Sequence, residues 1–164
     1  MRPTFTKLVA GLPATVPFVG PETLERRLGR EFDARLGANE CGFGPSPRAV
    51  AAMRDAAGEM WRYCDSTSHD LRGALAARHG LDPARITVGE GIDGLLGNAV
   101  RLFVEPGDRV VTSAGAYPTF NYHVAGFGGV LETVPYAEDR QDGRALADAV
   151  RRSGARMVYF CNPD

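Results

Sequence analysis

A glycine-rich turn before an apolar helix is the part of this sequence best suited to chemistry. Gly89, Gly91 and Gly94 directly precede the apolar stretch 95–104, which predicts a helix. Such a turn leaves the first backbone N–H groups of the helix free, and the helix dipole adds partial positive charge there. The turn therefore predicts an anion site that suits a phosphate group. A glycine turn without any ligand is the plainer alternative.

The same three glycines also match the formal dinucleotide-binding fingerprint G-x-G-x-x-G. That fingerprint needs an acidic residue about 20 positions later, at the end of the next strand, to hold a ribose hydroxyl. The sequence offers only residues 113–117, Ser-Ala-Gly-Ala-Tyr, which include no carboxylate. Half of the chain also precedes the turn, whereas the fingerprint usually opens its domain. Dinucleotide binding is thus the weaker alternative.

Short strands alternate with helices after residue 45, and this alternation has to position the turn. Ser46 and Pro47 supply a helix cap and a first-turn proline, and Gly80 ends a second helix. The expected helices are 46–60, 68–79, 95–104, 117–126 and 144–152, and the expected strands are 85–89, 109–113, 130–134 and 157–160. This order predicts an α/β fold with a mostly parallel sheet.

The last expected strand, residues 157–160 (MVYF), is a nearly continuous apolar run. Such strands are usually buried on both faces and have neighbours in the sheet. The chain then stops at Asp164, so we expect the sheet to be incomplete and either continued by further sequence or completed by a partner chain. An edge strand in a small complete domain is the alternative.

Composition and charge exclude several classes of function. The 164 residues carry 19 basic and 20 acidic side chains, a net charge of -1 that favours neither nucleic acid nor an anionic membrane. The three cysteines, with no CxxC pair, indicate reduced thiols in a cytoplasmic protein and no zinc site. No apolar run is long enough to span a membrane. Residues 8–19 faintly resemble a signal peptide, but Pro13 and Pro17 interrupt them, which favours an N-terminal arm.

Six collinear segments resemble the fold-type I pyridoxal-phosphate-dependent aminotransferases, most closely their histidinol-phosphate aminotransferase branch. The similarity covers residues 17–164. The segments, each similar to a motif of that family, are LGANECGFGPSP at 36–47, RYCD at 62–65 with Leu71-Arg72, VGEGIDGLL at 88–96, FVEPGDRV at 103–110, AYPTF at 116–120 and VYFCNPD at 158–164. The resemblance implies a three-layer α/β/α large domain, pyridoxal 5'-phosphate as cofactor, and amino transfer between an amino acid and a 2-oxo acid.

Site residues follow from this resemblance position by position. Gly91, Ile92 and Asp93 fall where backbone amides hold the cofactor phosphate. Tyr117 falls where an aromatic ring stacks on the pyridine ring. Tyr63 falls where a tyrosine reaches the cofactor phosphate of the partner subunit, which implies a homodimer with shared active sites.

The substrate pocket and the departures from the family pattern concern neighbouring positions. Asn39 and Glu40 fall in the segment that lines the pocket. Cys41 begins a Cys-Gly pair where the family has Asn-Pro, Ile92 replaces a small or hydroxyl residue, and Gly94 replaces a glutamate. These departures put the substrate in doubt more than the cofactor. His69, His79 and His123 have no metal-ligand spacing, and we expect them at the surface or at helix ends.

No catalytic residue of the family has a counterpart in these 164 residues. The only lysine is Lys7, which lies in the arm and does not match the Schiff-base lysine. We therefore expect residues 1–45 to form an arm and the start of the small-domain pocket segment, and residues 46–164 to form the first part of the large cofactor-binding domain. A chain ending at Asp164 would then be inactive alone.

Histidinol phosphate or an aromatic amino acid is the expected amino donor. A decarboxylase of the same fold, a non-catalytic phosphate-binding or interaction module, and a dinucleotide-binding domain stay open at this point.

Overall fold

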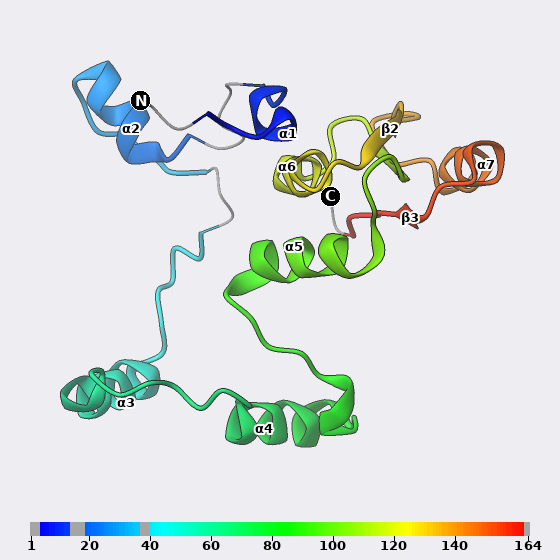
Figure 1. The fold of residues 1–164 in the computed structure, drawn as a ribbon. Coiled ribbons are helices and arrows are strands. Elements are labelled where there is room, and N and C mark those ends of the chain that lie inside the picture. Colours follow the sequence, from blue (N-terminus) through cyan, green and yellow to red (C-terminus); the bar gives the residue numbers. More distant parts are fainter. Residues whose placement is uncertain (1–3, 14–18, 37–39, 163–164) are drawn as a thin grey trace. The chain divides into compact units, whose positions relative to one another are not determined.

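The computed structural model describes residues 4–13, 19–36 and 40–162, which belong to two compact units (Figure 1). One unit comprises Met1–Phe18 and Gly89–Asp164, and the other comprises Val19–Val88. None of the helices in the described ranges has the length and apolar character needed to cross a bilayer.

A parallel sheet forms the centre of the first unit. Its strands are β1 (Arg109–Ser113), β2 (Val130–Val134) and β3 (Met157–Val158), in the order β2-β1-β3. Both pairings are parallel, with Arg109 opposite Val130 and Val110 opposite Met157. The last four residues of β1 are buried, so β1 is the strand around which the unit packs.

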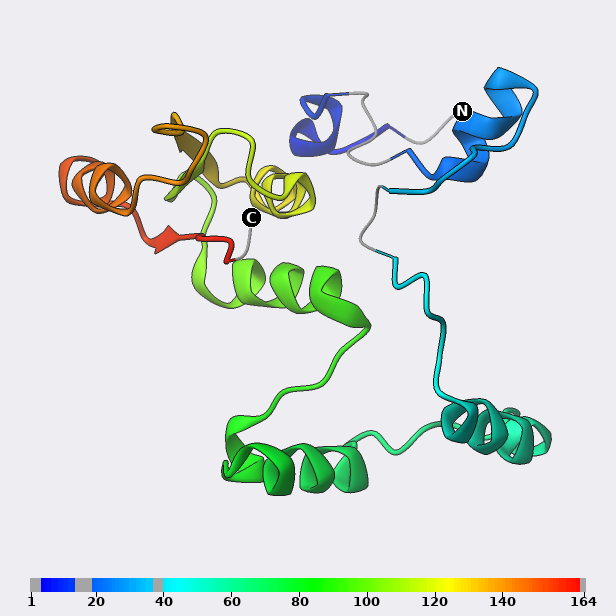
Figure 2. The same cartoon turned by 180° about the vertical axis from the view of Figure 1, so that it is seen from behind.

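Helices cover both faces of this sheet. Because successive side chains of a strand point to opposite faces, neighbouring residues of β1 contact different helices. On one face Val110 packs in a cluster with residues of α5 (Gly91–Phe103) and α6 (Pro118–Gly126). On the other face Val111 packs with Leu146 and Ala149 of α7 (Gly143–Ser153). Figures 1 and 2 show β2 and β3 between α6 and α7 from opposite sides. The predicted three-layer α/β/α arrangement with a parallel sheet is thus confirmed.

Two short helices lie near the amino terminus, one in each unit. Helix α1 (Lys7–Ala10) begins at Thr6, whose hydroxyl accepts a hydrogen bond from the Val9 amide. Helix α2 (Pro21–Leu28) ends at Gly29, which adopts a left-handed conformation.

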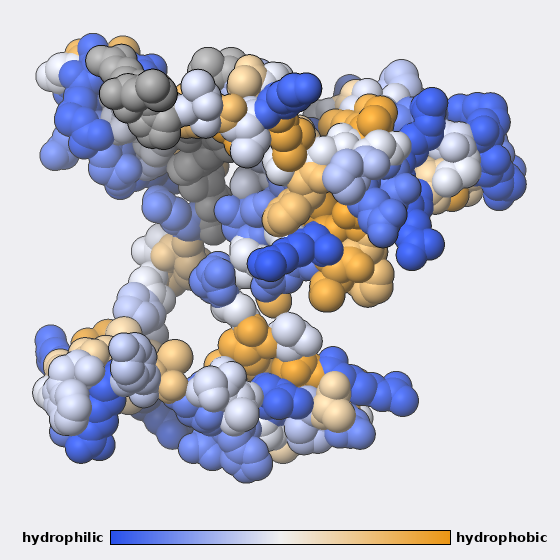
Figure 3. All heavy atoms as spheres, in the orientation of Figure 1, coloured by the Kyte–Doolittle hydropathy of each residue, from blue (hydrophilic) through white to orange (hydrophobic). Residues whose placement is uncertain are grey.

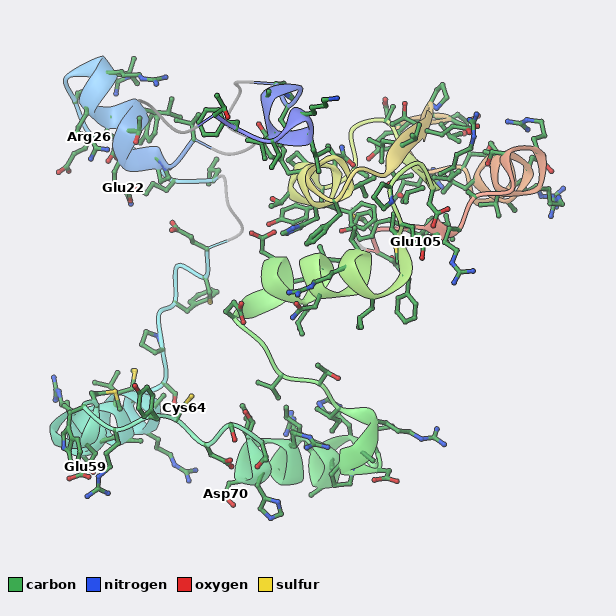
Figure 4. All side chains as sticks on the ribbon, in the orientation of Figure 1. Glu22, Arg26, Glu59, Cys64, Asp70 and Glu105 are labelled. Carbon is green, nitrogen blue, oxygen red and sulfur yellow. The ribbon has the colours of Figure 1, made fainter. Side chains whose placement is uncertain are left out.

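An ionic network folds the chain after α2 back onto that helix. Arg35 pairs with Glu22 at 2.9 Å and with Glu25 at 2.7 Å, and Glu25 also accepts the Phe32 amide at 3.0 Å. The Phe32 amide and the Arg35 guanidinium lower the pKa of Glu25. Glu22 and Arg26 project from α2 in Figure 4.

The remaining helices of the second unit are α3 (Pro47–Ala56), η1 (Ala57–Glu59), α4 (His69–His79) and η2 (Pro83–Arg85). Ser46 caps α3 and Gly80 ends α4, as predicted. Asp65 replaces the missing cap of α4 by accepting the His69 and Thr67 amides and the Thr67 hydroxyl. These hydrogen bonds lower the pKa of Asp65 to about 2.

The second unit buries little apolar surface of its own. Ala76 is its only buried hydrophobic residue in the described ranges, whereas Trp61 is 77% exposed and Met60 is 73% exposed. In the first unit, Leu102 and Phe103 are exposed at the end of α5, where Figure 3 shows hydrophobic surface.

Two strand predictions need correction. The predicted strand at 85–89 is wrong, because η2 takes up residues 83–85 and residues 86–89 pair with no strand of the described chain. Ile86 is extended, but extended backbone becomes a strand only through a hydrogen-bonded neighbour. The predicted strand at 157–160 shortens to 157–158 and lies at the sheet edge, where Val158 and Phe160 are about half exposed. The expectation of burial on both faces is therefore wrong here.

Candidate functional site

The amino terminus of α5 presents free backbone amides to solvent. The helix starts at Gly91, four residues earlier than predicted, and Glu90 before it makes no side-chain cap. The Gly91 amide donates to the Gly89 carbonyl oxygen at 2.8 Å, while the Ile92 and Asp93 amides have no acceptor among the described residues. All three residues are exposed. This 13-residue helix thus offers two free donors and its positive dipole end to an anion.

Glycine at position 91 leaves room for a ligand beside these amides. Its φ angle is +75°, a left-handed conformation that favours glycine, and a Cβ placed there would meet no atom within 4 Å. We call residues 91–93 the cradle. The open space beside Gly91 would allow a phosphate to approach the backbone of the cradle closely.

Glu90 folds back over Gly94 in the first turn of α5. A Cβ at Gly94 would lie only 2.7 Å from the Glu90 Cγ and 2.9 Å from its Cδ. The glycine at 94 therefore makes room for the Glu90 side chain. The sequence indicates the loss of a glutamate at position 94 but does not predict this contact, because residues 90 and 94 lie one helical turn apart only when the helix begins at Gly91.

His123 connects α6 to the cradle. Its Nε2 lies 3.0 Å from Asp93 Oδ1, and 26% of its side chain is exposed. The imidazole also packs against the buried Gly97, where a Cβ would lie 2.8 Å from ring atoms Cε1 and Nδ1. No pattern in the sequence predicts this contact, since His123 and Asp93 are 30 residues apart.

Tyr117 lies at the carboxyl end of the central strand and directly before α6. Ala116 before it is buried, and Pro118 after it is the first residue of the helix. The Tyr117 side chain is 40% exposed. It lies in the same unit as the cradle, but no hydrogen bond or ring contact joins the two in the described part of the chain.

The other predicted site residues lie in the second unit or outside the described ranges. Tyr63 is fully exposed after η1, and Glu40 is exposed near the start of its segment. Asn39 lies outside the described residues. Cys64, labelled in Figure 4, is a free thiol, as are Cys41 and Cys161.

A polar cluster that no sequence pattern predicts lies at the carboxyl edge of the sheet. The buried Ser113 hydroxyl donates to Gln141 Oε1 at 3.1 Å, and Gln141 Nε2 donates to the Cys161 carbonyl oxygen at 2.6 Å. Gln141 thereby ties the end of β1 to the segment after β3. It lines a cavity of about 420 Å³ together with Tyr136, Asn162 and others.

Comparison with known proteins gives one consistent family. The model of the family described as aminotransferase class I and II matches residues 34–164. The histidinol-phosphate aminotransferase of Rhodospirillum rubrum is 36% identical over 154 residues, which cover 94% of this chain and 41% of that protein. The chain thus spans about two fifths of the length of the curated relatives it matches.

Solved structures agree with this match. The histidinol-phosphate aminotransferase of Sinorhizobium meliloti, crystallised in complex with pyridoxal-5'-phosphate, has a TM-score of 0.91 and 59% identity, covering 98% of this chain and 42% of that one. An aspartate aminotransferase of Thermus thermophilus, at 23% identity and a TM-score of 0.71, shares the fold.

Proposed function

We propose, from the premise that this chain belongs to the aminotransferase class I and II family, that it is the amino-terminal portion of a pyridoxal-phosphate-dependent aminotransferase. The enzyme would transfer an amino group between an amino acid and a 2-oxo acid. The 59% identity to a histidinol-phosphate aminotransferase that binds pyridoxal-5'-phosphate is the observation that carries this proposal. It makes histidinol phosphate the leading amino donor, with aromatic amino acids next.

The described residues fit the phosphate end of that cofactor. Free amides at Ile92 and Asp93, open space beside Gly91 and the dipole of α5 support the proposal that a phosphate group binds here. Ile92 has no hydroxyl to add a side-chain contact, so the backbone amides would bind the phosphate on their own. We propose that Tyr117 orients the cofactor ring, because a flat and rigid side chain orders a planar ligand at small entropic cost.

Pyridoxal phosphate, when bound, supplies the electron sink for amino-group chemistry. The described residues contribute binding and orientation only. The sole lysine is Lys7, at the edge of the short helix α1, so we propose that the Schiff-base lysine lies outside residues 1–164 and that these residues alone are inactive.

The remaining assignments are proposals from the family resemblance. Tyr63 would reach the cofactor phosphate of a partner subunit in a homodimer, and its complete exposure agrees with a contact outside its own unit. Asn39 and Glu40 would line the substrate pocket. Residues 1–45 would form the arm and the start of the small domain, residues 46–164 would begin the large domain, and the enzyme would work in the cytoplasm.

Dinucleotide binding has less support. Its fingerprint requires a strand directly before the glycine turn, and residues 86–88 form no strand in the structure.

Removing a single amide of the cradle tests the cofactor proposal. In the protein expressed from its complete reading frame, Ile92→Pro removes one free N–H at a first-turn position that tolerates proline. Ile92→Ala is the matched control, because it shortens the side chain and keeps the amide. We expect Ile92→Pro to bind pyridoxal phosphate about ten-fold or more weakly than Ile92→Ala does, which is the loss expected for one hydrogen bond to a charged group.

Absorbance titration measures the dissociation constant of pyridoxal phosphate for each of the two variants. Pyridoxal, which lacks the phosphate, is titrated as a control ligand. Equal affinities of the two variants for pyridoxal phosphate would remove the cradle from the proposal. Failure of the unmodified protein to bind pyridoxal phosphate would overturn the proposed function. Incubation with histidinol phosphate and 2-oxoglutarate then tests the substrate by glutamate formation, and release of carbon dioxide from an amino acid would indicate a decarboxylase.

A further inference from the structure

A histidine on α6 lies within hydrogen-bonding distance of a carboxylate in the cradle. Asp93 belongs to the first turn of α5, within the three residues proposed to bind phosphate. His123 Nε2 lies 3.0 Å from its Oδ1. The Asp93 side chain is 53% exposed. Its only described hydrogen-bond partner is this imidazole on a neighbouring helix.

The position of the imidazole fixes where the carboxylate lies. Residues 93 and 97 occupy the same face of α5, four residues apart. The His123 ring packs on Gly97 at a distance that no larger residue allows, with a hypothetical Cβ 2.8 Å from two ring atoms. The hydrogen bond therefore holds the Asp93 carboxylate on the flank of α5 that carries Gly97 and faces α6.

This position matters because carboxylates and phosphates repel each other. A first-turn carboxylate is favourable to the helix dipole, but it competes with any anion bound at the same amides. Glu90 is the second carboxylate at this turn, and its side chain folds over Gly94 on an adjacent part of the helix. The cradle thus has to bind a dianion between two acidic side chains, only one of which has a described hydrogen-bond partner.

We propose that His123 is a positioning residue of the cofactor site, which holds Asp93 away from the bound phosphate and keeps the first turn of α5 in register with α6. The proposal rests on the proposed function, since it concerns the same cradle. Tyr117 directly precedes α6, so the link also joins the cradle to the helix that follows the proposed ring-stacking residue.

A mutant cycle in the protein expressed from its complete reading frame separates this role from simple packing. His123→Phe keeps a ring over Gly97 but removes the hydrogen bond. Asp93→Asn keeps an oxygen acceptor but removes the charge. The dissociation constants for pyridoxal phosphate and for pyridoxal are measured for both single variants, the double variant and the unmodified protein, together with the induced circular dichroism of the bound chromophore.

We expect His123→Phe to lower the affinity for pyridoxal phosphate about ten-fold, or ~1.4 kcal/mol, while the affinity for pyridoxal changes little. Adding Asp93→Asn should recover most of this loss, because the freed carboxylate no longer repels the phosphate. Asp93→Asn alone should bind pyridoxal phosphate at least as tightly as the unmodified protein. The induced circular dichroism should fall in His123→Phe, since the cradle is no longer fixed to α6.

Unchanged affinity in His123→Phe, or no recovery in the double variant, would overturn the positioning role while leaving cofactor binding intact. If His123→Phe fails to fold, Asp93→Asn decides the question, and a ten-fold loss in that variant alone would also overturn the role. Absence of binding by the unmodified protein would instead overturn the proposed function.

Discussion

Replacing Gly97 by alanine should destabilise the protein, although alanine is the better helix former. Gly97 lies in the interior of α5 without a positive φ angle, so backbone strain does not arise. Alanine would gain about 0.8–1.0 kcal/mol of helix propensity. Against this, the new Cβ would lie 2.8 Å from Cε1 and Nδ1 of His123, well inside van der Waals contact.

The clash has two costs. Overpacking in a filled interior costs about 1–3 kcal/mol, and Gly97 is buried on the side of α5 that packs against α6. If the imidazole moves away, its bond to Asp93 is lost, which for a partly exposed pair is worth about 0.2–1 kcal/mol. After the gain in propensity is subtracted, the two costs leave a loss of up to about 3 kcal/mol for Gly97→Ala, with about 1–2 kcal/mol in the middle of that range.

Gly94→Ala is the matched control, on the same helix and with the same chemical change. Its Cβ would meet the Glu90 side chain at 2.7 Å, but that chain is exposed and unbranched, so it can rotate into solvent. We expect this variant to be more stable than the unmodified protein by up to about 1 kcal/mol.

Urea denaturation followed by circular dichroism measures both changes in the protein expressed from its complete reading frame. The double variant Gly97→Ala with His123→Ala should recover stability relative to Gly97→Ala, because the ring that clashes is gone. The reasoning is refuted if Gly97→Ala stabilises the protein as Gly94→Ala does, or if removal of the ring gives no recovery.

Three further outcomes follow from the structure. Gln141→Leu leaves the buried Ser113 hydroxyl without its acceptor and should cost about 1–3 kcal/mol, measured by urea denaturation; Gln141→Glu should also be destabilising, because its carboxylate accepts from Ser113 but cannot donate to the Cys161 carbonyl oxygen. Because hydrogen bonds lower the folded pKa of Asp65 to about 2, from 3.8, its stabilising effect is complete above pH 4 and is lost as the pH falls toward 2. The protection of the His69 amide against hydrogen exchange, relative to its intrinsic exchange rate at the same pH, should therefore fall over that interval and should stay constant there in Asp65→Asn. Ile92→Ser adds a hydroxyl to the cradle and should raise the affinity for pyridoxal phosphate several-fold through one charge-assisted hydrogen bond. Absorbance titration measures this change.

Local signals made much of the fold predictable. Ser46 and Pro47 define the start of α3 within one residue, and Gly80 in its left-handed conformation ends α4 where the sequence places the stop. The strands at 109–113 and 130–134 are confirmed at both ends. These features depend on a few neighbouring residues, so a single sequence contains the information.

Pairing between distant segments was not predictable in the same way. Residues 86–88 have the β-branched composition of a strand, but a strand exists only where another strand supplies hydrogen bonds, and none in the described chain does. The run at 157–160 is apolar enough for a central strand, yet only one edge of it is paired. Composition indicated extended structure correctly, whereas the neighbours depend on the topology of the whole sheet.

The first turn of α5 shows why the departures from the family pattern should be considered together. Taken alone, the glycine at 94 removes a carboxylate that the family motif has. In the structure the Glu90 side chain occupies the space that a side chain at position 94 would need, so a carboxylate remains beside the same turn. Asp93 keeps its place and is held by His123. The negative charge around the cradle is thus rearranged and not reduced, which makes the hydrogen bond from α6 more important for binding an anion here than the sequence motif alone would indicate.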